Sequence, residues 1–144
     1  MQAATGVNKS TIVGYQAMYN HTGSGDEGNT FLGYRAGFQE TTGWNNVCLG
    51  YHAGYNLSTG SHNTYVGAHA GDAATTGNFN ICLGRGSDPS SNTAGGECTL
   101  GDSEISSLRC NDTSISSLSD RRDKTDIVDL PVGLDFINLS LIHI

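Results

Sequence analysis

The sequence is short of charge, lacks a basic patch and has no long apolar segment. Charged residues make up 15% of the 144 residues, whereas roughly 25% is usual for a globular domain. The formal net charge is −7 with the acids scattered, and the lack of a basic patch argues against a nucleic-acid partner. No apolar run approaches the ~18 residues of a membrane-spanning helix, so we expect no membrane insertion. The first residues have neither the basic nor the apolar region of a signal peptide.

Cysteine is present, but not at a metal-binding spacing. The four cysteines are Cys48, Cys82, Cys98 and Cys110, and no two form a Cys-x-x-Cys pair, which argues against a zinc site. Cys48 and Cys82 each precede a recurring glycine by two residues. We therefore predict that these two are buried free thiols at apolar core positions, and we expect no metal and no cofactor.

Glycine is abundant and periodic. It accounts for 20 of the 144 residues, about twice the usual frequency, which suits a turn-rich β structure. Two apolar residues precede each of five recurring glycines, and the pattern decays to Thr-Leu before a sixth. The six glycines are spaced by 19 and then four times by 17 residues: Gly14, Gly33, Gly50, Gly67, Gly84 and Gly101. Thr-Gly pairs keep the same register, as do Asn29, Asn46, Asn63 and Asn80. This near-constant period predicts a solenoid in which each repeat forms one rung, meaning one coil of the stack.

Each repeat has room for two short strands and two turns. Thr-Gly and Ala-Gly pairs mark the turns, because glycine tolerates positive φ. The apolar residues before each repeat glycine, such as Phe31 and Leu32, are consecutive, so in a strand they point to opposite faces. Both faces must then be buried, and the outer one must pack against another surface. Other copies of the same chain around an axis are the simplest solution, and we expect a homotrimer.

Residues 1–103 are thus predicted to be mainly β, a parallel β-roll or β-solenoid of ~17-residue repeats. The Gly-Tyr-x-Ala-Gly repeats resemble the β-roll heads of trimeric autotransporter adhesins. They are still more similar to the fibre repeats that precede chaperone modules in phage tail proteins. The resemblance, rather than the spacing, implies parallel stacking and threefold symmetry.

Several side chains in the repeats are candidates for binding. His52 and His69 fall in one column, one rung apart. In a trimer this column could form a ring of imidazoles for a metal ion or an anion, whereas a pair of solvated histidines is the simpler interpretation. Exposed aromatic residues are candidates for stacking on receptor sugars, with interior or interchain packing as the alternative for the tyrosines: Tyr15, Tyr34, Tyr51 and Trp44.

The period changes after Gly101. The sequence Ile105-Ser-Ser-Leu108 returns ten residues later as Ile115-Ser-Ser-Leu118. We predict a narrow β connector over residues 104–118, with a flexible Ser-rich linker as the alternative. The repeated Ile and Leu favour the β connector, because a linker does not need apolar residues in register.

A further change of pattern follows at residues 119–124, Ser-Asp-Arg-Arg-Asp-Lys. A Ser-Lys dyad cleaves peptides when the lysine is neutral near pH 7 and accepts the serine proton. Nearby positive charge lowers a lysine pKa, so Arg121 and Arg122 would favour the neutral form and Asp123 would oppose it. From the residues alone, Ser119 and Lys124 at this spacing are more often a coincidence than a dyad.

An apolar stripe follows, stepping by 3, 4 and 3 residues, which predicts a helix: Ile127, Leu130, Leu134 and Ile137. Together with this stripe, residues 119 to about 138 resemble the start of the self-cleaving C-terminal intramolecular chaperone of phage tail fibres, tailspikes and endosialidases. The resemblance implies that Ser119 is the nucleophile, Lys124 the base and Ser119–Asp120 the cleavage site. Attack by a neighbouring chain and an N-to-O shift before Ser119 are both open.

Residues 139–144 depart from the usual continuation of that family, so we expect residues 119–144 to be a truncated start of the chaperone domain with a helical fragment. The chain would then be at most a single-turnover, self-cleaving serine endopeptidase, inactive as it stands. The resemblance implies a structural and host-recognition segment of a viral tail fibre, carrying the autoproteolytic junction to a chaperone that assists trimer folding. It also implies a virion protein, made in the host cytoplasm, that binds a host cell-surface receptor, for which carbohydrate is one candidate.

Two other functions fit parts of the sequence. The head domain of a trimeric bacterial surface adhesin, with no proteolytic role, is the main alternative. It predicts a coiled-coil stalk after the repeats, and heptads are absent. An ice-binding solenoid would need a flat array of regularly spaced threonines, and Ser58 interrupts the row of Thr pairs.

Overall fold

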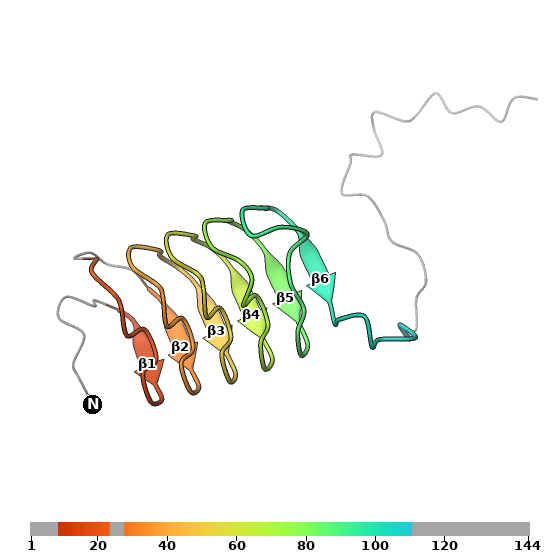
Figure 1. Cartoon of the computed structure of the whole chain (residues 1–144), viewed down its shortest axis with the longest axis horizontal. Coiled ribbons are helices and arrows are strands. Elements are labelled where there is room, and N and C mark those ends of the chain that lie inside the picture. Colours follow the sequence, from red (N-terminus) through yellow and green to blue (C-terminus); the bar gives the residue numbers. More distant parts are fainter. Residues whose placement is uncertain (1–8, 24–27, 111–144) are drawn as a thin grey trace, which may run out of the picture. The chain divides into compact units, whose positions relative to one another are not determined.

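The structure, a computed structural model, describes residues 9–23 and 28–110. Within these ranges the chain is mainly β, without a helix, and forms a parallel β-solenoid with one coil between each strand and the next (Figure 1). The six strands pair in chain order in one sheet: β1 (Thr11–Val13), β2 (Thr30–Leu32), β3 (Val47–Leu49), β4 (Thr64–Val66), β5 (Ile81–Leu83) and β6 (Cys98–Leu100).

The strand register confirms that one repeat forms one rung. Thr11 pairs with Thr30, 19 residues later, and Thr30 pairs with Val47, 17 residues later. The repeat glycines extend the ladder, since the amide of Gly50 donates to the carbonyl of Leu32 at 2.9 Å. The predicted parallel stacking of ~17-residue repeats is therefore correct.

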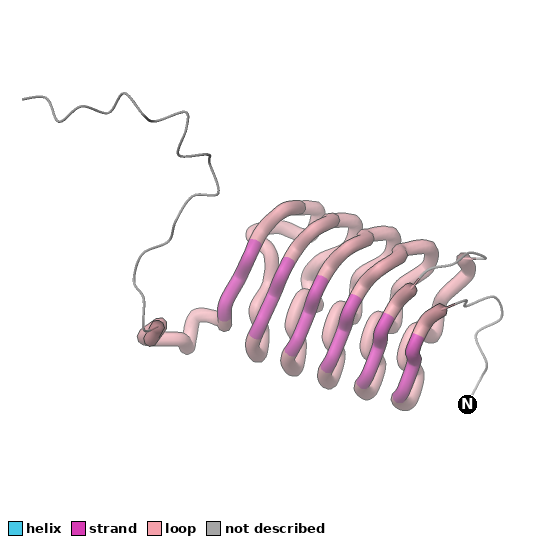
Figure 2. Tube along the Cα trace, turned by 180° about the vertical axis from the view of Figure 1, so that it is seen from behind, coloured by secondary structure: helices cyan, strands magenta, loops and turns pink. Residues whose placement is uncertain are grey.

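The prediction of two strands per repeat was wrong. Each described rung contains one strand of three residues, and the rest of the coil is turn or irregular (Figure 2). Left-handed residues curl the chain soon after each strand, as Arg35 (φ 53°) and Gly37 (φ 59°) do after β2. The returning segment still bonds to the next rung through single contacts, such as the amide of Thr41 to the carbonyl of Ser58 at 2.8 Å, but it forms no regular ladder.

The core is a narrow column of side chains inside the coils. The middle residue of each central strand is fully buried: Phe31, Cys48, Tyr65 and Cys82. The prediction that Cys48 and Cys82 are buried free thiols is confirmed, and Tyr65 lies in register between them. Burial, with a smaller contribution from Glu40, raises the pKa of Cys48 far above that of a free thiol, so Cys48 stays protonated and inert.

Glycines allow the rungs to approach closely. At Gly50 (φ 143°) an added Cβ would lie 2.5 Å from the carbonyl oxygen of Gly67. The Ala-Gly glycines have the expected positive φ, for example 61° at Gly54. The Thr-Gly glycines differ from expectation: Gly60 does not have positive φ, and glycine is needed there because a Cβ would collide with the carbonyl oxygen of Gly77 on the next rung.

The outer face of the sheet is not buried within one chain. Phe31 is 0% exposed, whereas its neighbour Leu32 is 50% exposed. We call the column that continues Leu32 the outer apolar column: Val13, Leu32, Leu49, Val66, Leu83 and Leu100. The expectation that consecutive apolar residues point to opposite faces is therefore correct, but a single chain covers only the inner face.

The predicted connector and the chaperone start are described only in small part. Residues 104–110 contain no strand, and the remainder of the connector lies outside the described residues, so the β connector stays a prediction. Contacts divide the chain after Leu108 into two units, of which the second is described only at Arg109 and Cys110. In the described ranges no helix is long and apolar enough to cross a membrane.

Candidate functional site

The residues predicted to carry self-cleavage, Ser119, Asp120 and Lys124, lie outside the described residues, as does the helical fragment that follows them. Their roles stay predictions. Within the described ranges, no group of three or more His, Cys, Asp or Glu side chains is arranged to hold a metal ion. The surface features of the solenoid are therefore the candidates for function.

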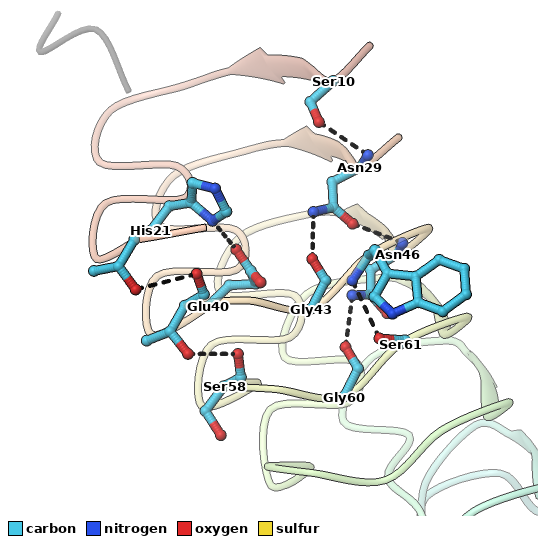
Figure 3. Close-up of polar contacts among 12 residues, drawn as sticks. Ser10, His21, Asn29, Glu40, Gly43, Asn46, Ser58, Gly60 and Ser61 are labelled. Carbon is cyan, nitrogen blue, oxygen red and sulfur yellow. Dashed lines mark hydrogen bonds and ion pairs between the residues drawn. The ribbon is translucent and has the colours of Figure 1, made fainter. Parts of the chain in front are cut away.

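The periodic asparagines form a buried ladder that holds each coil closed (Figure 3). The side-chain amide of Asn46 donates to the carbonyl of Gly60 at 2.8 Å, across its own rung. Its Oδ1 accepts the backbone N–H of Asn63, on the next rung, at 3.0 Å. Asn29, Asn63 and Asn80 repeat both contacts. The 17-residue spacing showed that these residues recur, but not that each satisfies two backbone groups.

A buried ionisable pair stands in the first two rungs (Figure 3). His21 Nδ1 lies 2.7 Å from Glu40 Oε2, and the two side chains are 1% and 0% exposed. Later rungs place Leu57 and Ala74 in the same column, both fully buried. The sequence analysis missed this pair, although a glutamate in register with a core leucine was a signal for it.

The tyrosines stack on one another after the strands. Tyr15, Tyr34 and Tyr51 form one ladder, with ring centroids 5.7 and 5.3 Å apart and planes within 11°. Tyr19, Phe38 and Tyr55 form a second, with centroids 5.4 and 5.2 Å apart. Because neighbouring rings cover the faces of Tyr34 and Phe38, these rings present mainly edges to solvent. The tyrosine ladders are thus better suited to internal stacking than to sugar binding, whereas Trp44 lies apart, before β3.

His52 and His69 share one column, as predicted, and His52 contacts Tyr51 of the first ladder and Tyr55 of the second. The rings of His52 and His69 are 5.2 Å apart, and His52 also stacks on Tyr51 at 4.2 Å. His69 Nδ1 lies 2.7 Å from Asp72 Oδ2. Partial burial, followed by the charges of His69 and Arg35, lowers the pKa of His52, with Asp72 acting in the opposite direction.

This column predicts that acidification weakens the solenoid. A histidine whose pKa is lowered by folding contributes stability that is fully present above the unfolded-state pKa of about 6.5 and is lost as the pH falls through the folded-state pKa. We expect the thermal midpoint to fall between about pH 7.5 and about pH 5. The fall should be smaller in His52→Asn, because asparagine tolerates the left-handed φ of 57° and does not titrate. Arg35→Gln should also reduce it. An unchanged fall in His52→Asn would show that His52 is not the sensitive group.

Threonines form one exposed column, not a flat array. Thr42, Thr59, Thr76 and Thr93 are exposed in register. In the adjoining column the hydroxyls of Thr41, Ser58 and Thr75 donate to backbone carbonyls of the next rung, at 3.0, 3.1 and 3.0 Å. Of these two adjoining columns, only the one that contains Thr42 is free of these bonds to the next rung, which does not favour a flat ice-binding surface.

A scan of protein-family models and searches of curated proteins and of solved structures found no match for this chain. Two surface features, the outer apolar column and the exposed aromatic residues, are candidates for contact with a binding partner.

Proposed function

We propose that residues 9–110 belong to the shaft of a homotrimeric fibre, in which the outer sheet face of each chain packs against the other two. The outer apolar column carries this proposal. Its members at the two ends of the sheet, Val13 and Leu100, are 51% and 50% exposed, and Leu83 between them is 39% exposed. Leu49 and Val66, in the middle of the column, are partly buried. A row of apolar side chains that one chain leaves exposed or only partly covered marks an interaction site.

Copies of the same chain fit this surface better than an unrelated partner does. Each rung contributes one Val or Leu to the column, at steps of about 4.8 Å. Rotation about an axis parallel to the solenoid keeps the rungs level, so each apolar side chain meets its equivalent in the next chain. Closed cyclic symmetry of this kind is common among homo-oligomers. Three copies are proposed because the repeats resemble those of trimeric fibres and adhesin heads.

The biological setting is part of the same proposal. The repeats and residues 119–138 together resemble a viral tail fibre with a self-cleaving chaperone, and this resemblance supports a structural and host-recognition role in the virion. The adhesin head remains the alternative, since it would use the same trimeric solenoid without Ser119 and Lys124. Assembly and cleavage can be tested separately.

Lysines in the outer apolar column should prevent assembly. We expect the wild-type chain to sediment as a trimer and the double variant Leu32→Lys, Leu83→Lys to sediment as a monomer with an unchanged far-UV spectrum, because three sets of lysines would face one axis. Thr59→Lys, Thr76→Lys is the matched control, with the same added charge on the exposed threonine column, and should remain trimeric. A wild-type monomer at micromolar concentration would contradict the proposal.

Cleavage is tested by intact mass. With a C-terminus of the length usual in the chaperone family, the chain should be cut at or next to Ser119, and Ser119→Ala should remain whole, because the proposed nucleophile is missing. Lys124→Met should also remain whole, since the base that accepts the serine proton is lost. An uncut wild-type chain that still forms trimers would leave the fibre repeat in place and favour the adhesin alternative.

A further inference from the structure

A third aromatic ladder, separate from the two that contain the tyrosines, runs along the turns that precede β3, β4 and β5. The rings of Trp44 and His62 are 4.3 Å apart in an edge contact, and those of His62 and Phe79 stack at 4.8 Å with planes 6° apart. Trp44 is 48% exposed and Phe79 is 65% exposed. The ladder is thus ordered by ring contacts and open to solvent.

The backbone under this ladder is one that favours glycine. His62 and Phe79 both have φ of 61°, in the left-handed region, which is strained for a residue as bulky as Phe. Backbone bonds fix this conformation, since the amides of His62 and Phe79 donate to carbonyls of the preceding rung at 3.0 and 3.2 Å. Backbone strain at a residue with an exposed side chain suggests a function for that side chain, because a glycine at the same position would remove the strain.

The ladder stops at Gly96. This glycine occupies the same place on the next rung, with φ of 76° and its amide bonded to the carbonyl of Asn78 at 2.9 Å. A Cβ at Gly96 would meet no heavy atom within 4 Å. One face of Phe79 is therefore covered by His62, while the other face borders an open position where the next ring of the ladder would lie.

The turns around this open position are polar and carry no charged side chain. The carboxylate of Glu97, directly after Gly96, accepts hydrogen bonds from the amide and the hydroxyl of Ser90. The four turns that form this edge, residues 41–45, 58–62, 75–79 and 92–96, contain no Asp, Glu, Lys or Arg. They are rich in hydroxyls and amides, and Thr76 and Asn78 are exposed beside Phe79. The opposite edge, after the strands, carries Arg35 and Asp72. A ligand for the turns before the strands should therefore be uncharged, with one apolar face and many hydrogen-bonding groups.

We propose that this edge binds neutral carbohydrate, with a pyranose ring lying on the free face of Phe79, over Gly96, in place of the next ring of the ladder. The apolar C–H face of the sugar covers the aromatic ring, and its hydroxyls bond to the exposed amides and hydroxyls of the adjoining turns. Because the ladder is fixed by the backbone, the surface needs little reordering to bind. The inference names the ligand class for host recognition and to that extent rests on the proposed function.

The test uses the whole chain and a panel of neutral probes. Saturation-transfer NMR is recorded with the methyl glycosides of glucose, galactose, mannose and N-acetylglucosamine and with their neutral oligosaccharides. We expect binding by the wild type and at least tenfold weaker binding by Phe79→Gly, which removes the platform. Gly96→His should weaken binding equally, because it keeps every aromatic residue and fills the open position.

Controls separate loss of the site from loss of the fold. Phe79→Gly should melt close to the wild type, since glycine suits its φ of 61°. His69→Gly, the same kind of change on the opposite edge, should bind sugar as the wild type does. No binding to any neutral probe, binding only to anionic glycans, or undiminished binding by Phe79→Gly and Gly96→His would overturn the inference. A wild-type trimer that does not bind sugar would overturn this inference alone, whereas a wild-type monomer that binds sugar would overturn the proposed assembly.

Discussion

Gly50→Ala should destabilise the solenoid by about 3–5 kcal/mol, or prevent folding. The backbone of Gly50 has φ of 143°, and a Cβ there would lie 2.5 Å from the carbonyl oxygen and 2.7 Å from the carbonyl carbon of Gly67. Both obstacles are backbone atoms that are held in register by the parallel ladder, so neither rung can move aside alone. Urea-induced unfolding, followed by far-UV circular dichroism, measures the loss.

Gly96→Ala is the matched control for this substitution. Gly96 also has positive φ, 76°, but a Cβ there would have no neighbour within 4 Å. Only the strain of a left-handed alanine remains, which costs about 1–2 kcal/mol. If the two variants lost equal stability, backbone strain alone would account for the repeat glycines, and the close approach of the rungs would not matter.

Asn63→Ala should cost roughly 2–6 kcal/mol, because two buried backbone groups lose their partners at roughly 1–3 kcal/mol each. The Asn63 amide donates to the carbonyl of Gly77 at 2.9 Å, and its Oδ1 accepts the N–H of Asn80 at 3.0 Å. Asn63 itself is 0% exposed, so water cannot replace it without opening the coil. The loss should appear as a lower urea midpoint.

Two further variants make this prediction specific. Asn56→Ala removes an exposed asparagine whose amide donates to the carbonyl of Asp72 at 2.7 Å, and should cost less than about 1 kcal/mol. Asn63→Asp keeps an acceptor for Asn80 but can donate to Gly77 only when protonated. Burial raises the pKa of such a carboxyl group above its unfolded-state value. The variant should therefore lose stability as the pH rises through the raised pKa, because the carboxyl group then loses its proton. Similar losses in Asn56→Ala and Asn63→Ala would argue against a special role for the ladder.

The repeat itself determined most of the fold. The spacing of Gly33, Gly50 and Gly67 gave the size of the rung, and a parallel stack places residues one repeat apart in register. The burial of Cys48 followed from the same spacing, because Cys48 precedes its repeat glycine by two residues, as Phe31 does, and so shares the column of Phe31. These features depend on sequence distance alone, and a regular array converts sequence distance directly into position.

Only the tertiary structure decided how each rung uses its side chains. Whether Gly60 is needed for φ or for space depends on the carbonyl of Gly77, and the role of Asn63 depends on groups 14 and 17 residues away. The same holds for the tyrosine ladder, whose faces are covered by neighbouring rungs, and for Phe79, whose outer face is open because Gly96 follows. Such roles are set by contacts between rungs, and a sequence pattern identifies which residues are neighbours without giving the direction in which each side chain points.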